Sequence, residues 1–360
     1  MSFYFSIFGI LAFFSLVELF KLKDSQRKMA FGVFSLFFFI LSFVRWEIGT
    51  DWGTYYDFFE SSTEWGKQSV FEWGFSRLNE FANIVFGNYT ALLFILGAIL
   101  FAFQTAALYK LSPYPITSLL FLWSVSFGNA MFIRQSISTA ILLFSVIYII
   151  KQKFWPFLIC VAVAMLFHRT SFIFLPAWWI YRMKIKPLWL WIGVGASVLC
   201  TVMIKNLIES LAGAFGPIIQ AKIDMYLSDS ETTFGTAASL VQIIVKGVLN
   251  KLAVFLFLML MMTRASEKYP YYKGLVNLYW VGILIYFSTI GISVAMIRFS
   301  FAYDILQAIL VPMLFVFVQG STNKMLWFFV FLLYLSARLY VLLVGSYYNL
   351  FVPFKTIFSQ

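Results

Sequence analysis

The stretch "AFGVFSLFFFILSFVRWEIGTDWGTYYDFFE", residues 30–60, changes character at its middle. Up to Val44 it carries no charge and is rich in phenylalanine and leucine. From Arg45 onward arginine, glutamate and aspartate return, with glycines among them. An apolar run of about 20 residues can cross a hydrocarbon core of roughly 30 Å. The first half therefore predicts a transmembrane helix. The second half predicts either an ordinary loop or one wall of a site.

The whole chain has the composition of that first half. Of its 360 residues, 62% are hydrophobic, 21% are aromatic and only 11% are charged, whereas a soluble domain carries about a quarter charged residues. This excludes an ordinary soluble protein. The apolar runs do not alternate between polar and apolar residues, as the strands of an outer-membrane barrel would. The sequence predicts an all-α, polytopic membrane protein.

We expect about twelve transmembrane helices in a single domain, residues 1–360. Apolar length and charged borders place them at 2–20, 29–45, 89–109, 115–132, 133–150, 154–168, 170–181, 187–204, 239–262, 274–296, 299–319 and 325–344. Residues 46–88 mix aromatic rings with acids, which predicts amphipathic helices on the outer membrane surface. Residues 205–238 are expected to form a second outer loop that could act as a lid.

The basic residues orient this topology. With Met1 outside, every inner loop is basic, as the positive-inside rule requires, and the outer loops are net acidic. The net charge of +11 is thereby explained, and no nucleic-acid partner is expected. The two cysteines lie inside apolar runs and indicate neither a disulfide nor a metal site. No nucleotide-binding loop or metal-ligand motif is present, so we expect no cofactor and no metal.

Four arginines run against the positive-inside rule because they fall at the predicted outer boundary: Arg45, Arg134, Arg169 and Arg298. His168, the only histidine, falls there too. The chain takes 17 residues from Arg134 to Lys151 and 15 from Lys153 back to His168. At about 1.5 Å per residue, these nearly equal legs place Arg134 and His168 at similar depth at one end of a helical hairpin.

The chemistry of these side chains allows two interpretations. A guanidinium fork suits phosphate and stays charged, so a cluster at the headgroup level fits a lipid-linked pyrophosphate. Alternatively, each arginine reaches an ordinary lipid phosphate. His168 is either structural, a proton shuttle or a donor to phosphate. The rings and acids of residues 46–88 suit a carbohydrate or, alternatively, anchor the chain at the interface.

The block "NAMFIRQSISTAILLFSVIYIIKQKFWPFLICVAVAMLFHRTSFIFLPAWWI", residues 129–180, resembles the EpsG-like family of bacterial polysaccharide polymerases, the Wzy type. The resemblance lies in an Arg-Gln pair, Arg134 and Gln135, and in a Phe-His-x-Ser variant that begins at Phe167 and precedes a proline. Three further segments resemble the family: Arg45 with Gly49, Asp51 and Tyr55; Arg298 with Tyr303; and residues 348–355.

This resemblance implies a metal-independent glycosyltransferase of GT-C-like architecture. Such an enzyme moves a growing glycan from undecaprenyl pyrophosphate to the non-reducing end of a new undecaprenyl-pyrophosphate-linked repeat. The reaction takes place at the outer face of the bacterial inner membrane. Lipid-linked oligosaccharides, membrane lipids and a chain-length regulator protein are the implied partners.

The leaving pyrophosphate gains negative charge, so preorganised cations lower the barrier. We expect Arg134 and Arg298, helped by Arg45 and Arg169, to bind it. Asp51 is the first candidate for the general base that takes the acceptor proton, with Glu47 and His168 as alternatives. We expect Gln135, Tyr303 and Asp304 to support the site.

Three rival functions share these features. A flippase of lipid-linked glycans would also be polytopic and basic, although its charges should lie at many depths. An O-antigen ligase or another polyprenyl-dependent glycosyltransferase would also have an arginine-rich outer site. A membrane acyltransferase can also pair arginine with histidine.

Overall fold

The computed structural model describes residues 1–20, 22–63, 71–212, 240–290, 294–344 and 348–359. Within these ranges the ordered elements are helices, joined by one isolated antiparallel bridge between Arg45 and Thr356. The all-α prediction is confirmed. The chain divides into two compact units, Met1–Phe172 with Val311–Gln360 (unit 1) and Ile173–Leu310 (unit 2). The single transmembrane domain over 1–360 stays a prediction.

Unit 1 contains helices from both ends of the chain. They are α1 (Ser2–Phe20), α2 (Asp24–Val44), α3 (Trp52–Glu60), α4 (Trp73–Phe86), α5 (Tyr89–Leu111), α6 (Pro115–Ser126), η1 (Phe127–Asn129), α7 (Arg134–Ile150), α8 (Phe154–Met165), η6 (Leu314–Val316), α18 (Ser321–Val344) and α19 (Tyr348–Phe351). The 3-10 helix η2 (Arg169–Phe174) crosses into unit 2, and α17 (Gln307–Met313) crosses back.

Unit 2 contains shorter and more interrupted elements. They are α9 (Ala177–Ile180), α10 (Pro187–Ala212), α12 (Leu240–Gly247), the π-helix η4 (Val248–Leu252), α13 (Ala253–Leu260), α14 (Met262–Lys268), α15 (Tyr272–Ile290), the 3-10 helix η5 (Val294–Ser300) and α16 (Phe301–Asp304). The predicted second outer loop, 205–238, lies outside the described residues from 213 onward, and its first residues continue α10.

Five helices in the described ranges are long and apolar enough to cross a membrane: α1, α2, α5, α15 and α18. The number rises to seven if two bent pairs each count as one span, Ile244–Leu260 with Met262–Lys268 (67°) and Met296–Asp304 with Gln307–Val316 (44°). The multi-pass prediction is confirmed at this level. Twelve were expected, and helices such as α6 and α8 have 12 residues each. At about 1.5 Å per residue, these two do not cross a core of about 30 Å.

A buried carboxylate fixes the start of α6. Glu18 of α1 accepts hydrogen bonds from the backbone N–H groups of Ile116 (3.0 Å) and Thr117 (2.8 Å), and from the Thr117 hydroxyl (2.8 Å). The first N–H groups of a helix lack partners inside the helix, and its N-terminus attracts negative charge. Glu18 supplies acceptors for these N–H groups, which explains an acidic residue inside an otherwise apolar helix.

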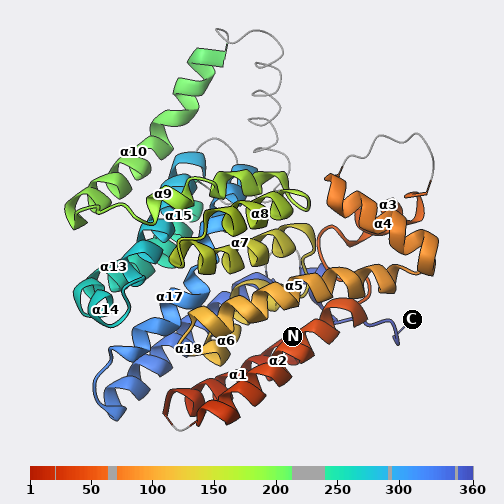
Figure 1. Ribbon diagram of the computed structural model, residues 1–360, viewed down its shortest axis with the longest axis horizontal. Coiled ribbons are helices and arrows are strands. Elements are labelled where there is room, and N and C mark those ends of the chain that lie inside the picture. The colour runs from red at the N-terminus through yellow and green to blue at the C-terminus, as the bar shows by residue number, and fades with distance from the viewer. Residues whose placement is uncertain (21, 64–70, 213–239, 291–293, 345–347, 360) are drawn as a thin grey trace. The chain divides into compact units, whose positions relative to one another are not determined.

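The described part of segment 46–88 contains the two helices α3 and α4 (Figure 1). Their aromatic rings pack against one another. The Tyr55 ring lies 5.2 Å from that of Phe75, and Phe58 lies 4.7 Å from Phe71. Helices α7 and α8 form the expected hairpin, closed by a turn at Lys151–Lys153. The position of α3 and α4 at the membrane surface stays a prediction.

Candidate functional site

The start of α4 abuts the end of α8 in unit 1. The Phe75 N–H donates to the Leu166 carbonyl at 3.2 Å. A Cβ atom on Gly74 would lie 2.7 Å from the Leu166 Cβ and 2.9 Å from its carbonyl oxygen, so only glycine allows this approach. The aromatic segment is therefore docked on the end of the α7–α8 hairpin, where Arg134 and His168 were expected.

Glu72 and Arg134 form an ion pair at this junction. Arg134 opens α7, and Glu72 immediately precedes α4. Their side chains are 17% and 8% exposed. The other carboxylate oxygen of Glu72 accepts the Arg169 N–H at 3.1 Å. Glu72 thereby joins the two legs of the hairpin, which agrees with their nearly equal lengths in the sequence.

The charge state of Glu72 follows from competing effects. Burial raises the pKa of its carboxyl, but the hydrogen bond from the Arg169 N–H and the positive charge of Arg134 outweigh it. The net result holds the Glu72 pKa below its usual range. Glu72 is therefore an anion at neutral pH. A carboxylate with a lowered pKa is a weak base, which suits an orienting role better than proton transfer.

Three aromatic rings surround the Arg134 guanidinium. Its central carbon lies 4.6 Å from the Phe71 ring centre, 5.7 Å from that of Phe75 and 5.9 Å from that of Tyr55. Rings at these distances attract a cation and restrict its orientation. The buried Nε of Arg134 has no hydrogen-bond partner within the described part of the chain. The guanidinium is thus held firmly, and its Nε donor is not used by the described part of the chain.

Tyr55 connects this cluster to Asp51. Its hydroxyl donates to the Asp51 Oδ2 in a long hydrogen bond of 3.4 Å. Burial and the Asp51 charge raise the pKa of Tyr55 against the opposing charge of Arg134. Asp51 itself is exposed, directly before α3. The structure therefore brings together Asp51, Arg134 and the chain at Arg169, through Tyr55 and Glu72.

His168 lies in the turn between α8 and η2. Its Nδ1 is 2.7 Å from the Thr170 hydroxyl, and its carbonyl accepts the Ser171 hydroxyl at 2.7 Å. Ser171 in turn contacts Ser138 of α7. These bonds close the end of the hairpin that carries Arg134, and they hold the imidazole beside Arg169, whose side chain is exposed. Gln135 is half-buried on the first turn of α7.

Arg45 and Glu47 contact the C-terminal segment instead. Arg45 is 2% exposed, and its guanidinium donates to the carbonyls of Ser42 (3.2 Å) and Ile48. Glu47 pairs with Lys355 at 2.6 Å, and both side chains are about half exposed. The Trp46 N–H donates to the Lys355 carbonyl at 3.0 Å. The geometry gives both residues a part in holding the C-terminal segment. Pyrophosphate binding by Arg45 and base catalysis by Glu47 stay predictions.

The remaining predicted residues belong to unit 2. Arg298 is exposed on η5. The Tyr303 hydroxyl donates to the Ile173 carbonyl at 2.8 Å. Asp304 forms an ion pair with Lys251 of the π-helix η4 and accepts the Ser300 hydroxyl at 2.6 Å. Tyr303 and Asp304 therefore fasten the bent helices of unit 2.

Sequence reasoning missed Glu72. Its one visible signal is that it stands alone among rings in "VFEWGF", residues 70–75. Its burial arises only when α4 docks on α8, which the sequence does not display. Among the described residues, no group of three histidines, cysteines, aspartates or glutamates is placed to hold a metal ion.

A family model now places the chain among known proteins. The EpsG family model matches residues 28–356, which include the Glu72–Arg134 cluster, the hairpin and the C-terminal segment. The chain belongs to the EpsG family. The resemblance inferred from residues 129–180 is thereby confirmed. This membership indicates a membrane polysaccharide polymerase of glycosyltransferase type. No curated protein and no solved structure matches this EpsG-family chain.

Proposed function

We propose that this EpsG-family protein joins lipid-linked oligosaccharide repeat units into a polysaccharide. It transfers the growing glycan from undecaprenyl pyrophosphate to the non-reducing end of a new undecaprenyl-pyrophosphate-linked repeat. The observation that carries this proposal is the Glu72–Arg134 cluster, in which a caged guanidinium with a spare donor lies near an exposed carboxylate. Such a pairing suits a reaction that needs an anion site and a base close together in the fold.

The transfer makes one bond and breaks one. The acceptor hydroxyl oxygen bonds to the anomeric carbon and gives its proton to a base, for which we propose Asp51. The bonding pair of the old glycosidic link leaves with the pyrophosphate oxygen. We propose that Arg134 stabilises this growing charge, because a preorganised cation costs no reorganisation during the reaction. Glu72 and the rings hold Arg134 in place, and Arg169 and His168 contribute further donors.

Further details of the prediction belong to the same proposal. They are a GT-C-like arrangement with about twelve membrane segments, location in the bacterial inner membrane and a reaction at the outer face. Short helices that end inside the bilayer would reconcile the larger count with the five to seven full spans. Arg298 of unit 2 is proposed as a second residue that binds anionic phosphate. A chain-length regulator protein is a proposed partner.

The proposed binding of the leaving pyrophosphate by Arg134, here called the phosphate clamp, is tested by Arg134→Ala and Arg134→Lys. Each variant is expressed in cells that lack the chromosomal copy of the gene. We expect Arg134→Ala to abolish the polymer ladder, and Arg134→Lys to restore little, because an ammonium lacks the planar fork. The control is Arg77→Ala, since Arg77 lies on α4 but is 60% exposed and, within the described residues, forms its ion pair with Glu80. A wild-type ladder in a well-expressed Arg134→Ala strain would contradict the clamp.

The proposed base is tested in the same strain by Asp51→Asn. We expect loss of polymer with normal protein levels. The matched control is Asp57→Asn, an exposed aspartate on α3. Surface display separates the rival flippase, because loss of a polymerase leaves single repeats on the cell surface and loss of a flippase leaves none. A wild-type amount of polymer from Asp51→Asn would contradict Asp51 as the base and would assign that role to Glu47 or His168.

A further inference from the structure

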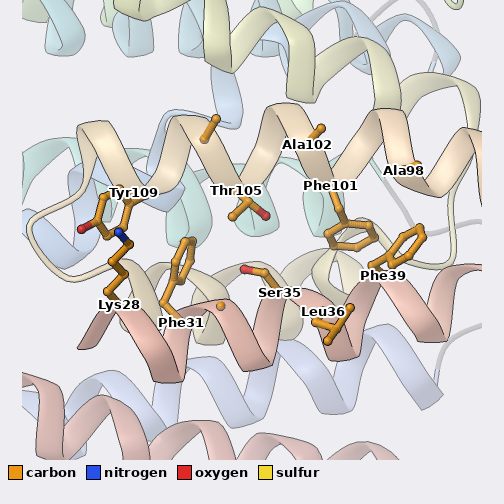
Figure 2. A pocket seen from close by; sticks show the side chains of 12 residues that line it. Lys28, Phe31, Ser35, Leu36, Phe39, Ala98, Phe101, Ala102, Thr105 and Tyr109 are labelled. Atoms are coloured by element: carbon orange, nitrogen blue, oxygen red, sulfur yellow. The ribbon is translucent and has the colours of Figure 1, made fainter. Parts of the chain in front are cut away.

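A groove of about 580 Å³ runs between α2 and α5, on a side of unit 1 that the proposed reaction does not use (Figure 2). Rings from Phe31, Phe39, Phe101 and Tyr109 line its sides. Small residues leave the space open, among them Gly32, Ala98 and Ala102, all exposed. The groove is therefore an apolar depression on the surface of two membrane-spanning helices.

One end of the groove is closed by close contact between α2 and α5. A Cβ atom on Gly97 would lie 2.3 Å from the Ser42 hydroxyl oxygen and 3.4 Å from the Phe39 ring. The Phe39 and Phe94 rings pack edge to face at 5.2 Å across the same place. The groove therefore ends before the end of α2 that leads to Arg45.

The other end is open and basic. Lys28 is exposed at this mouth, beside Tyr109, whose ring stacks on Phe31 at 6.0 Å (Figure 2). From Lys28 to Phe39 is eleven residues, or about 16 Å along the helix axis. That is close to half of a hydrocarbon core of about 30 Å. The groove thus has about the length of one leaflet, and Lys28 is the charged residue among those that line it.

We propose that this groove binds one acyl chain of an anionic phospholipid from the leaflet at the Lys28 end. The chain packs against the small residues of α2 and α5, and the headgroup phosphate pairs with Lys28. A basic residue at the membrane surface attracts anionic lipid. The lining between the rings is apolar, so the groove suits a hydrocarbon chain better than a polar soluble ligand.

The dimensions argue against a helix from a second copy. About 580 Å³ over about 16 Å leaves a cross-section of roughly 36 Å². A helix about 10 Å across needs more than twice that area. A single hydrocarbon chain fits. The closed end near Ser42 also separates the groove from Arg134, so the proposal is independent of the phosphate clamp.

The test uses the purified full-length protein in detergent, with phosphatidylglycerol and phosphatidylcholine as probes. Native mass spectrometry counts the retained lipids, and thermal unfolding measures stabilisation. We expect one phosphatidylglycerol to be retained over phosphatidylcholine, with a rise in Tm. Lys28→Gln should remove the preference between the two lipids, whereas Lys110→Gln, which changes a neighbouring exposed lysine outside the groove, should keep it.

A second variant fills the groove. Ala102→Phe should lose the retained lipid and its Tm rise, while Leu333→Phe, which adds bulk at an exposed position of α18, should keep both. Equal retention of the two lipids by the unchanged protein would overturn the proposal. So would displacement of phosphatidylglycerol by undecaprenyl phosphate at equal concentration, which would assign the groove to the carrier lipid. A change from dimer to monomer on Ala102→Phe would assign it to a second copy.

Discussion

Two buried ion pairs, one in each unit, have nearly the same burial. The side chains of Arg134 and Glu72 are 17% and 8% exposed, and those of Lys251 and Asp304 are 9% and 15% exposed. Each cation also lies near aromatic rings, with the Lys251 Nζ 4.5 Å from the Tyr286 ring centre. Burial and charge alone therefore do not distinguish a site from a structural contact.

The polar atoms that remain distinguish them. Within the described ranges, the buried atom without a hydrogen bond is a donor in the first pair, Arg134 Nε, and an acceptor in the second, Asp304 Oδ1. A phosphate oxygen can accept a hydrogen bond from a free N–H donor, whereas an ionised carboxylate oxygen has no proton to donate to it. A Cβ on Gly282 would come within 3.2 Å of Asp304 Oδ1, so α15 covers that acceptor. This difference favours anion binding at Arg134 and helix fixation at Lys251.

The largest effect is expected from Lys251→Met. Removing one partner of a buried pair leaves the other as an uncompensated charge, which costs about 3–5 kcal/mol. The Tm in detergent should fall steeply, and little folded protein should reach the membrane. The double variant Lys251→Met with Asp304→Leu should recover most of the loss, because no charge is then left buried. Lys246→Met, at an exposed lysine of α12, is the control. A double variant as unstable as the single one would contradict helix fixation by charge.

A smaller effect is expected from Glu72→Gln. The amide oxygen can still accept the Arg169 N–H, so the loss is the ionic hydrogen bond between Glu72 and Arg134, about 1–3 kcal/mol for a hydrogen bond to a charged group. Polymer should fall while the protein stays folded. If Lys251→Met in a folded preparation lowers polymer as much as Glu72→Gln does, the two pairs do not differ in function.

The pH dependence of Glu72 sharpens the same contrast. Its folded-state pKa is lowered, so its contribution to stability is present above the ordinary carboxyl pKa and is lost as pH falls through the lowered value. Thermal unfolding of the unchanged protein should show this loss on acidification. Glu72→Gln should show a smaller change over the same range. Equal profiles for the two proteins would contradict the assigned charge on Glu72.

The sequence predicted where helices lie better than which of them are continuous. Apolar length placed α1, α2 and α5 within a few residues, because burial in lipid needs only composition and length. It did not show that the span at 239–262 contains a π-helix. There the Tyr279 hydroxyl, from α15, donates to the Lys251 carbonyl at 3.1 Å. Such a break depends on a distant partner that supplies the missing hydrogen bond.

The same limit applies to the site. The numbers of residues on either side of Lys151 correctly predicted that Arg134 and His168 lie at the same end of a hairpin. The sequence could not predict that Glu72 pairs with Arg134, because this pairing depends on the contact between Gly74 of α4 and Leu166 at the end of α8. Nor could it show that Arg45 would form a β-bridge with Thr356, more than 300 positions later. Local periodicity carries no information on such contacts.

The smallest effect is expected at the exposed pair of Glu47 and Lys355. Both side chains are about half exposed, and such pairs contribute under about 1 kcal/mol because water and salt screen them. Lys355→Ala should therefore leave the Tm nearly unchanged. The backbone bonds of Trp46 and Gly49 to the C-terminal segment, at 3.0 and 3.2 Å, should keep that segment attached.

Glu47→Gln then separates structure from chemistry at this position. If Asp51 is the base, Glu47→Gln should match Lys355→Ala in both stability and polymer, because the two changes remove the same exposed ion pair. If Glu47 is the base, only Glu47→Gln should abolish polymer. Since the pair contributes so little to stability, a difference in polymer between these two variants can come only from the carboxylate itself. That result would move the acidic part of the site from Asp51 to Glu47 and away from the Arg134 cluster.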